Sequence, residues 1–499
     1  MTTTVTPESL LSDNDLPRRQ RWPARLWGVL AVLSLVLFLD GLDVSMVGVA
    51  LPSIGTELHL TTSSLQWIVS GYVLGYGGLL LLGGRTADLL GRRRVFLIAL
   101  AVFAVASLLG GLVDSGPLLI ATRFVKGVSA AFTAPTGLSI ITTTFAEGRM
   151  RNKALSIYTV FGASGYSSGL IFGGLMTGIG WRWTFLMPVP IAIVALTAGL
   201  ALIPRDTPAS SGGHDILGAL TSTGAMLVLV YDLVSAPARG WTSPVTLALF
   251  AAVIVLLIAF VYVERRVRHP LVRLGILRKG TLVRANLAIV ALFGSYTSFQ
   301  FIITLYLQDV LGWAPLKMAL ALLPAGLLVA LSAPFAGTMI DRFGTARFIV
   351  GGLAAMSAGY VLFLPIGTHP VYVTAILPTA VLLGVGFALG FPSINVQATA
   401  GIHDDEQGLA AGLVQTAAQV GAALVLAVTT ALISGDGPPA RTAAGVLAEY
   451  RPGLVFVTFV AVAGLAMALV PFAVRRRARH VGAHRAEIVP AEVEEAEAA

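Results

Sequence analysis

The strongest constraint on the fold is a series of long apolar runs. Fourteen stretches of the sequence each hold mostly apolar residues over about 20 positions, the length that an α-helix needs to cross a bilayer. They lie near residues 27–52, 64–83, 95–113, 117–145, 154–178, 184–203, 216–235, 244–263, 285–309, 316–338, 346–366, 371–395, 408–433 and 453–474. Only 12% of the residues are charged, against roughly 25% in a typical soluble domain. The runs exclude a soluble enzyme, a disordered chain and a coiled coil, and they predict an all-α integral membrane protein.

The basic residues predict how these spans are oriented. If the N-terminus lies inside and the spans alternate, most lysines and arginines fall on inner loops, for example Arg92–Arg94 and Arg475–Arg477. Cytoplasmic loops carry such an excess of positive charge. The net charge of +8 is thus explained by topology, and we expect no nucleic-acid partner. The even number of spans and the positive inner loops predict a multi-pass protein with both termini in the cytoplasm. The excess of arginine over lysine, with abundant alanine, suggests a bacterium of high GC content, so we expect the bacterial cytoplasmic (inner) membrane.

A motif of the form G-x3-D-x2-G occurs on an inner loop after the second span and again after the tenth. Its glycines permit tight turns, and its carboxylate can pair with nearby arginines, so the cluster can hold one closed state of a moving protein. The alternative is a basic loop that only sets topology. The conformational gating candidates in the two copies are Gly84, Asp88, Gly91, Arg92, Arg93, Asp341, Arg342 and Gly344.

The repeat divides the chain into two related halves of six spans, with two inserted spans between them. Two such halves, with a substrate site between them near the midplane, are typical of secondary transporters that work by alternating access. The predicted segments are a cytoplasmic N-terminal tail (1–25), an N-terminal six-helix half (26–205), two inserted helices with a basic cytoplasmic loop (206–282), a C-terminal six-helix half (283–474) and a disordered cytoplasmic tail (475–499).

Further motifs carry a resemblance to a known family. Leu42–Pro52 is similar to L-D-x-T-I-V-N-V-A-L-P of its first helix, and Arg123–Gly127 to R-x2-Q-G of its fourth. Gly165–Gly174 is similar to G-x3-G-P-x2-G-G of its fifth helix, and Trp181–Trp183 to W-R-W-I-F. In these motifs the chain resembles the major facilitator superfamily, and closely its fourteen-helix drug:proton antiporter family.

The resemblance implies the major facilitator fold, with two pseudo-symmetric six-helix halves plus two inserted helices. It implies a secondary active transporter that exports hydrophobic or cationic drugs or antibiotics in exchange for protons. Gly48 and Leu170 depart from the family's usual Asn and Pro, which leaves the substrate class open. The alternative is a proton-coupled or facilitative carrier of a small metabolite on the same fold.

Four charged residues fall inside predicted spans. Asp40 and Asp43 lie three residues apart on one face of the first span, and Arg123 and Lys126 have the same spacing on the fourth. Two neighbouring carboxylates cannot easily both ionise in a low-dielectric cavity, so one can carry a proton. The resemblance points to Asp43 and Arg123 for proton coupling, and Asp40 is an addition of this sequence. The alternative is an ion pair that only fixes the two helices.

Other polar and aromatic residues within the spans are candidates for the substrate cavity. Asp232 lies near the outer end of the seventh span, where we expect an outer-rim residue with water access, although it also could attract a cationic substrate. The glycines of the fifth span are compatible with close helix packing and also with a gating surface between the halves. The cavity candidates are Lys126, Tyr72, Tyr158, Tyr296, Phe299, Gln300, Asn395, Gln415 and Asp232, and the gating glycines are Gly165, Gly169, Gly173 and Gly174.

No motif in the sequence indicates an enzyme. Ser167 lies in a G-x-S-x-G pattern, but in the middle of a predicted span rather than at a strand-to-helix turn. The chain has no cysteine, and it lacks a P-loop and an H-E-x-x-H motif. We therefore expect no metal and no cofactor, with the proton gradient as the energy source. The expected partners are a small-molecule substrate, protons and the lipid bilayer, and we expect a monomer.

Overall fold

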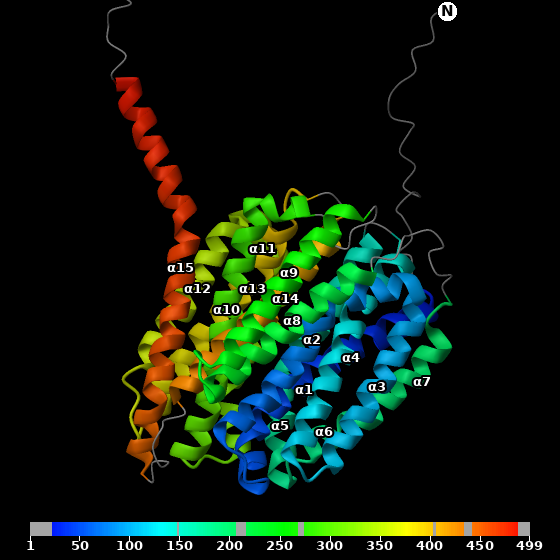
Figure 1. Cartoon of the computed structure of the whole chain (residues 1–499), viewed down its shortest axis with the longest axis vertical. Coiled ribbons are helices and arrows are strands. Elements are labelled where there is room, and N and C mark those ends of the chain that lie inside the picture. The colour runs from blue at the N-terminus through cyan, green and yellow to red at the C-terminus, as the bar shows by residue number, and fades with distance from the viewer. Residues whose placement is uncertain are drawn as a thin grey trace, which may run out of the picture.

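The computed structural model describes residues 22–146, 149–205, 216–267, 274–402, 406–433 and 442–487, and within these residues it is built of helices. Helix α1 begins at Ala24 at one end of the bundle, which we call the near end, and ends at Glu57 at the opposite, far end. The near end is uppermost in Figure 1.

The N-terminal part of the chain contains α1 to α7, and the last two together form one span that is interrupted before Pro188. The bounds are α1 (Ala24–Glu57), α2 (Thr62–Leu90), α3 (Arg92–Leu112), α4 (Gly116–Thr144), α5 (Arg149–Ile179), α6 (Trp183–Leu186) and α7 (Pro188–Leu202). The remaining elements are α8 (Ile216–Arg239), α9 (Pro244–Arg266), η2 (Leu274–Arg278), α10 (Gly280–Leu305), η3 (Tyr306–Val310), α11 (Pro315–Phe343), α12 (Thr345–Phe363), η4 (Tyr372–Ile376), α13 (Leu377–Thr399), α14 (Gln407–Ile433) and α15 (Ala443–Glu487).

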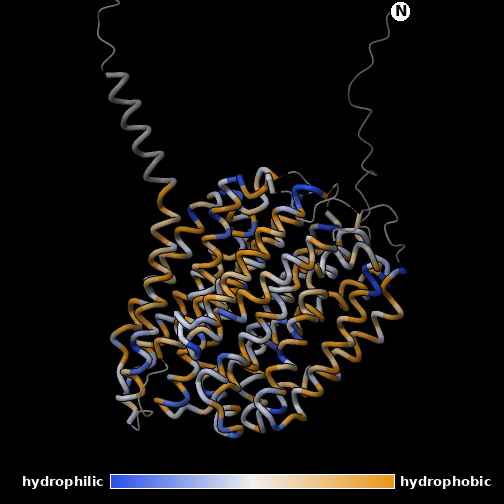
Figure 2. The backbone as a smooth tube through the Cα atoms, in the orientation of Figure 1, coloured by the Kyte–Doolittle hydropathy of each residue, from blue (hydrophilic) through white to orange (hydrophobic). Residues whose placement is uncertain are grey.

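The fourteen predicted apolar runs all fall on these helices. Within the described residues, twelve helical segments are long and apolar enough to cross a membrane, and apolar residues dominate the bundle in Figure 2. The two further runs lie on α2 and α5, which are 29 and 31 residues long but are not among the twelve. The all-α membrane fold is therefore confirmed, while the count of fourteen spans stays a prediction.

The helices of the two halves pack in the same order. In the first half α1 packs along α5, α2 along α4 and α3 along α7; in the second half α10 packs along α14, α11 along α13 and α12 along α15. Two seams join the halves, since α5 lies against α11 and α2 against α14. Each seam thus pairs the fifth helix of one half with the second helix of the other, which is the arrangement expected of two halves related by a pseudo-twofold axis.

The two copies of the repeated motif end their helices in the same way. Gly91 follows α2 with a φ of 93°, and Gly344 follows α11 with a φ of 83°. L-residues with a side chain rarely adopt such angles, so the second glycine of each motif allows a sharp turn into the next helix. The glycines therefore act as predicted for tight turns in both halves.

The inserted helices α8 and α9 pack against each other, and α8 also packs on both α2 and α14. Val230 and Val234 of α8 form one buried cluster with Val73 of α2 and with Ala422 and Ala423 of α14. This insertion therefore lies across one of the two seams, in the front of Figure 1. The boundaries of the predicted segments remain predictions.

Candidate functional site

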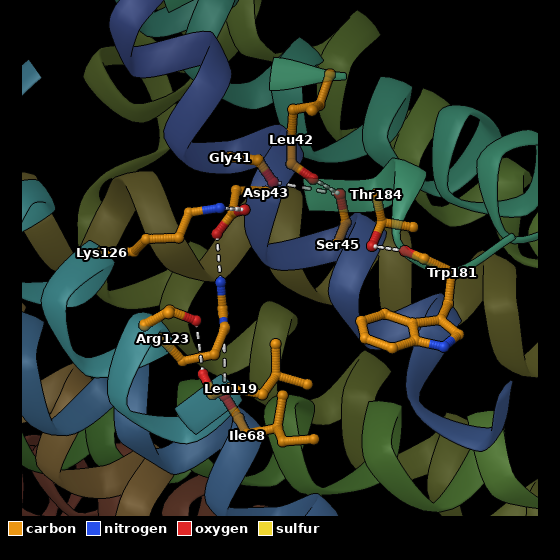
Figure 3. A network of polar contacts seen from close by, with 11 residues as sticks. Gly41, Leu42, Asp43, Ser45, Ile68, Leu119, Arg123, Lys126, Trp181 and Thr184 are labelled. Atoms are coloured by element: carbon orange, nitrogen blue, oxygen red, sulfur yellow. Dashed lines mark hydrogen bonds and ion pairs between the residues drawn. The ribbon is translucent and has the colours of Figure 1, made fainter. Parts of the chain in front are cut away.

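A buried ion cluster joins α1 to α4. Asp43 forms ion pairs with both Arg123 and Lys126, and the three residues are 0%, 2% and 0% exposed (Figure 3). A charge in a membrane interior needs a partner or a water-filled cavity. Here two cations share one carboxylate, so the cluster by itself keeps one positive charge.

Aromatic rings surround the two cations. The guanidinium of Arg123 lies 4.7 Å from the centre of the Tyr72 ring, and its Nε donates to the carbonyl oxygen of Ile68 at 3.2 Å. The ammonium of Lys126 lies 4.8 Å from the ring centre of Phe103 and 5.3 Å from that of Phe185. Ring faces attract cations, so α2, α3 and α6 help to hold the charges that Asp43 does not neutralise.

Asp40 differs from Asp43 although it lies only one turn away. Its carboxylate accepts a hydrogen bond from the hydroxyl of Thr133 at 3.3 Å and is buried. Within the described part of the chain no cation forms an ion pair with it. The predicted pair of carboxylates is thus present, but only Asp43 has cationic partners.

The glycines of α5 bring α1 close to that helix. A Cβ atom on Gly165 would meet the backbone of Phe38, one on Gly169 would meet Leu42, and one on Gly173 would lie 2.9 Å from the Cα of Met46. These three predicted gating residues therefore pack within the first half, and they position the helix that carries Asp40 and Asp43.

Two residues of α5 instead reach the other half. A Cβ on Gly174 would lie 2.7 Å from the Cα of Leu316 on α11, and the hydroxyl of Ser167 donates to the carbonyl oxygen of Gly326 at 2.8 Å. Gly174 is therefore the gating candidate of this helix that lies on a seam. Ser167, the serine of the G-x-S-x-G pattern, therefore joins α5 to α11.

The matching place in the second half holds aromatic rings. Phe387 and Phe391 of α13 stack with centroids 5.1 Å apart, and Phe293 and Tyr296 of α10 lie 6.2 and 5.0 Å from Phe387. Tyr166 of α5 extends this group across the halves, 6.2 Å from Tyr296. We call these five residues the aromatic cluster. They are half-buried, so part of each ring is accessible.

Sequence reasoning found only Tyr296 of this cluster. Phe387 and Phe391 have the i,i+4 spacing that puts two rings on one helix face, which was the available signal. The partner ring Phe293 and the cross-half ring Tyr166 depend on tertiary packing, and no local pattern identifies them.

The other cavity candidates lie in different surroundings. Phe299 is 1% exposed and packs against the rings of Tyr360 and Phe363, so it belongs to the hydrophobic core. Tyr158 is buried and donates to the carbonyl oxygen of Ala134 at 3.4 Å. The half-buried candidates are Gln300, Gln415 and Asn395, the last of which donates to the carbonyl oxygen of Phe391 at 2.8 Å.

The expectation of water access at Asp232 is wrong. Its side chain is fully buried, and one carboxylate oxygen pairs with Arg239 at 3.3 Å. The other oxygen is buried and has no hydrogen-bond partner in the part of the chain that the structure describes. The sequence places this residue near a helix end. Its burial follows from the packing of α8 on α2 and α14, which the position of a residue along its helix does not predict.

The two copies of the gating motif differ in their surroundings. Arg92 and Arg93 are half-buried, and Arg93 donates to the carbonyl oxygen of Leu200 at 2.5 Å. In the second copy, Asp341, Arg342 and Gly344 are exposed. Gly84 is half-buried, and the side chain of Asp88 lies outside the described residues.

A charged clamp at the far end was missed by the sequence reasoning. Arg182 forms ion pairs with Glu57 and with Asp114, and its guanidinium lies 4.5 Å from the ring centre of Trp181. The indole of Trp181 donates to Glu57 at 2.9 Å. The hydrogen bond to the Glu57 carboxylate raises the pKa of Arg182, so this arginine stays charged. The W-R-W motif was the signal, and it ties α1 to two loops of its own half.

The fold and these motifs agree with comparisons to known proteins. The model of the Major Facilitator Superfamily matches residues 33–426. The puromycin resistance protein of Streptomyces alboniger is 36% identical over 458 residues, which cover 88% of this chain and 89% of that protein. The cephamycin export protein of Amycolatopsis lactamdurans is 35% identical over 413 residues, 81% and 85% of the two chains.

Solved structures agree on the fold. A nucleoside transporter superposes with a TM-score of 0.64 at 12% identity, over 89% of this chain and 100% of that one. The family match covers most of the sequence, and the helix packing is that of two related halves. The chain therefore belongs to the major facilitator superfamily of membrane transporters.

Proposed function

We propose that this transporter exports a hydrophobic or cationic antibiotic-like compound in exchange for protons. The observation that carries the proposal is the buried cluster of Asp40, Asp43, Arg123 and Lys126, because ionisable residues inside a membrane bundle mark ion pathways. The names of the two relatives, which describe puromycin resistance and cephamycin export, support the export direction and the substrate class.

Within this cluster, Asp40 is the residue that exchanges the proton. Asp43 is held by two cations and stays ionised, whereas Asp40 accepts a hydrogen bond from the Thr133 hydroxyl and has no ion pair among the described residues. A buried carboxylate without a counter-ion is held most easily as the neutral acid. With Asp40 protonated the cluster is net positive and repels a cationic substrate; with Asp40 ionised the cluster is neutral and accepts one.

The aromatic cluster of α10, α13 and Tyr166 supplies the apolar part of the substrate site. Its rings are half-buried and come from both halves, so a flat compound bound there contacts both. Exposed ring faces bind apolar and cationic groups. The ion cluster between α1 and α4 and the aromatic cluster at α10 and α13 would together suit a compound with a flat apolar body and a positive group.

The packing of α11 supports alternating access. This helix buries residues between Met318 and Gly326 but none from Leu327 to Met339. Near the far end, Gln308 donates to the carbonyl oxygen of Val49 in the other half at 2.9 Å. The halves thus meet at the far end and the middle, while the side chains of the near part of α11 are not buried against the other half. With the near end in the cytoplasm, this is the form that is open to the inside.

The test is substrate flux in vesicles that contain the purified full chain. One side of the vesicle membrane is made more acidic than the other. We expect puromycin or ethidium to move against its concentration gradient toward the acid side, and a proton ionophore should stop this movement. Asp40→Asn should lose the dependence on the pH gradient by at least tenfold and keep downhill exchange. Thr133→Val is the matched control, because it keeps the carboxylate and changes only its partner.

Two outcomes contradict the proposal. Uphill transport by Asp40→Asn with an unchanged dependence on the pH gradient would remove Asp40 from proton exchange. If the substrate moved only down its own concentration gradient, or if the protein imported a small metabolite, the function would be that of a facilitative or nutrient carrier instead of proton-coupled export.

A further inference from the structure

A groove lies on the outside of the bundle, away from the contacts between the halves. It has a volume of about 640 Å³ and opens on the outer face of α14 and α15 near the far end. Its lining is apolar except for one arginine, and the lining residues are Leu432, Ala448, Arg451, Pro452, Val455, Phe456 and Phe459. This groove plays no part in the proposed exchange of substrate and proton.

The groove has a polar and an apolar end. Leu432 lies one residue before the end of α14 at Ile433, and Gly453 of α15 contacts Ile433, so Arg451 lies where α14 leaves the membrane. At 1.5 Å per residue, Phe459 lies about 12 Å deeper along α15. An arginine at the surface level and rings one to two turns below it match the layers of a lipid, a charged headgroup followed by acyl chains.

Arg451 is an exposed arginine at the polar end of the groove. Within the described residues no carboxylate forms an ion pair with it. The far-end arginine of the first half behaves differently, since Arg182 is paired with both Glu57 and Asp114. Val455 and Phe459 are 57% and 66% exposed, so the groove below Arg451 is also uncovered.

We propose that this groove binds one anionic phospholipid, with the phosphate on the Arg451 guanidinium and an acyl chain along Phe456 and Phe459. The argument is charge complementarity at the membrane surface combined with an apolar groove that continues into the bilayer. Together they favour a headgroup with a net negative charge over a zwitterionic one, whose own cation Arg451 would repel. Because α14 forms a seam with α2, the lipid lies against a helix that connects the two halves.

The experiment measures lipid retention by the purified full chain in detergent. Native mass spectrometry with phosphatidylglycerol and phosphatidylcholine of the same acyl chains should show retention of the anionic lipid in at least fivefold preference. Arg451→Gln should lose this preference, and Arg451→Lys should keep part of it. Lys317→Gln removes a far-end cation outside the groove and should keep the full preference. Phe459→Ala should weaken retention of both lipids.

Several results would overturn the proposal. One is equal retention of both lipids by the unmodified chain, which would mean bulk lipid contact only. Another is an unchanged preference for the anionic lipid in Arg451→Gln. Competition by inorganic phosphate at millimolar concentration would also overturn it, since the acyl chain would then contribute nothing. The thermal unfolding of each variant in lipid-free detergent shows whether a loss of preference reflects misfolding.

Discussion

The two halves have the same helix packing but hold different chemistry in the same place. Between α1 and α4 the first half places a carboxylate with two cations; between α10 and α13 the second half places a stack of aromatic rings. The packing that both halves share is made by small residues at helix crossings, such as Gly169 on Leu42 and Gly421 on Val290. The difference teaches that the fold depends on the shared contacts, while the buried ion cluster belongs to the first half and the stacked pair of rings to the second.

The largest effect should come from removing the shared carboxylate. Asp43→Asn leaves Arg123 and Lys126 buried with little compensation, and breaking such a pair costs about 3–5 kcal/mol. We expect a large loss of folded protein, measured as the fraction that remains monodisperse after heating in detergent. Asp40→Asn is the control, since it removes a carboxylate without a cationic partner and should leave the stability close to that of the unmodified chain. Equal losses in both variants would remove the distinction between the two carboxylates.

The shared packing should respond alike in the two halves. Gly169→Ala and Gly421→Ala each push a Cβ against the backbone of the first helix of their half, at Leu42 and Val290. Overpacking of this kind costs about 1–3 kcal/mol, so both variants should unfold at lower temperature by a similar amount. Gly337→Ala is the control, because a Cβ there has no neighbour within 4 Å. A loss confined to one half would show that the halves are not equivalent in packing.

The smallest effect should come from trimming one ring. Phe391→Ala removes a partner of the Phe387 stack, and we expect the KM for an aromatic substrate to rise about tenfold, or about 1.4 kcal/mol, with the pH dependence of transport unchanged. Phe299→Leu is the control, since that ring packs in the core against Tyr360 and Phe363. If Phe391→Ala instead altered proton coupling, the division of chemistry between the halves would be wrong.

The sequence predicted much of this arrangement because membrane helices leave strong local signals. Apolar runs located the helices, and the G-x3-D-x2-G motif located both turns at Gly91 and Gly344. The i,i+3 spacing placed Asp40 and Asp43 on one helix face. The sequence did not predict that Asp43 takes both cations, because that depends on how deeply α4 lies beside α1. It also misjudged Asp232, whose burial is decided by neighbours that are remote in the chain.

The inserted helix α8 has a consequence for motion. It packs on both α2 and α14, whereas among the described residues neither α8 nor α9 packs along α5 or α11. An inserted helix therefore packs across one seam, whereas at the other seam α5 and α11 are joined by further contacts from α1 and α10. If the halves rotate as rigid bodies, the α2 and α14 side must move with α8 as one unit or break its contacts. In that case we expect the wider displacement between the halves at the α5 and α11 seam.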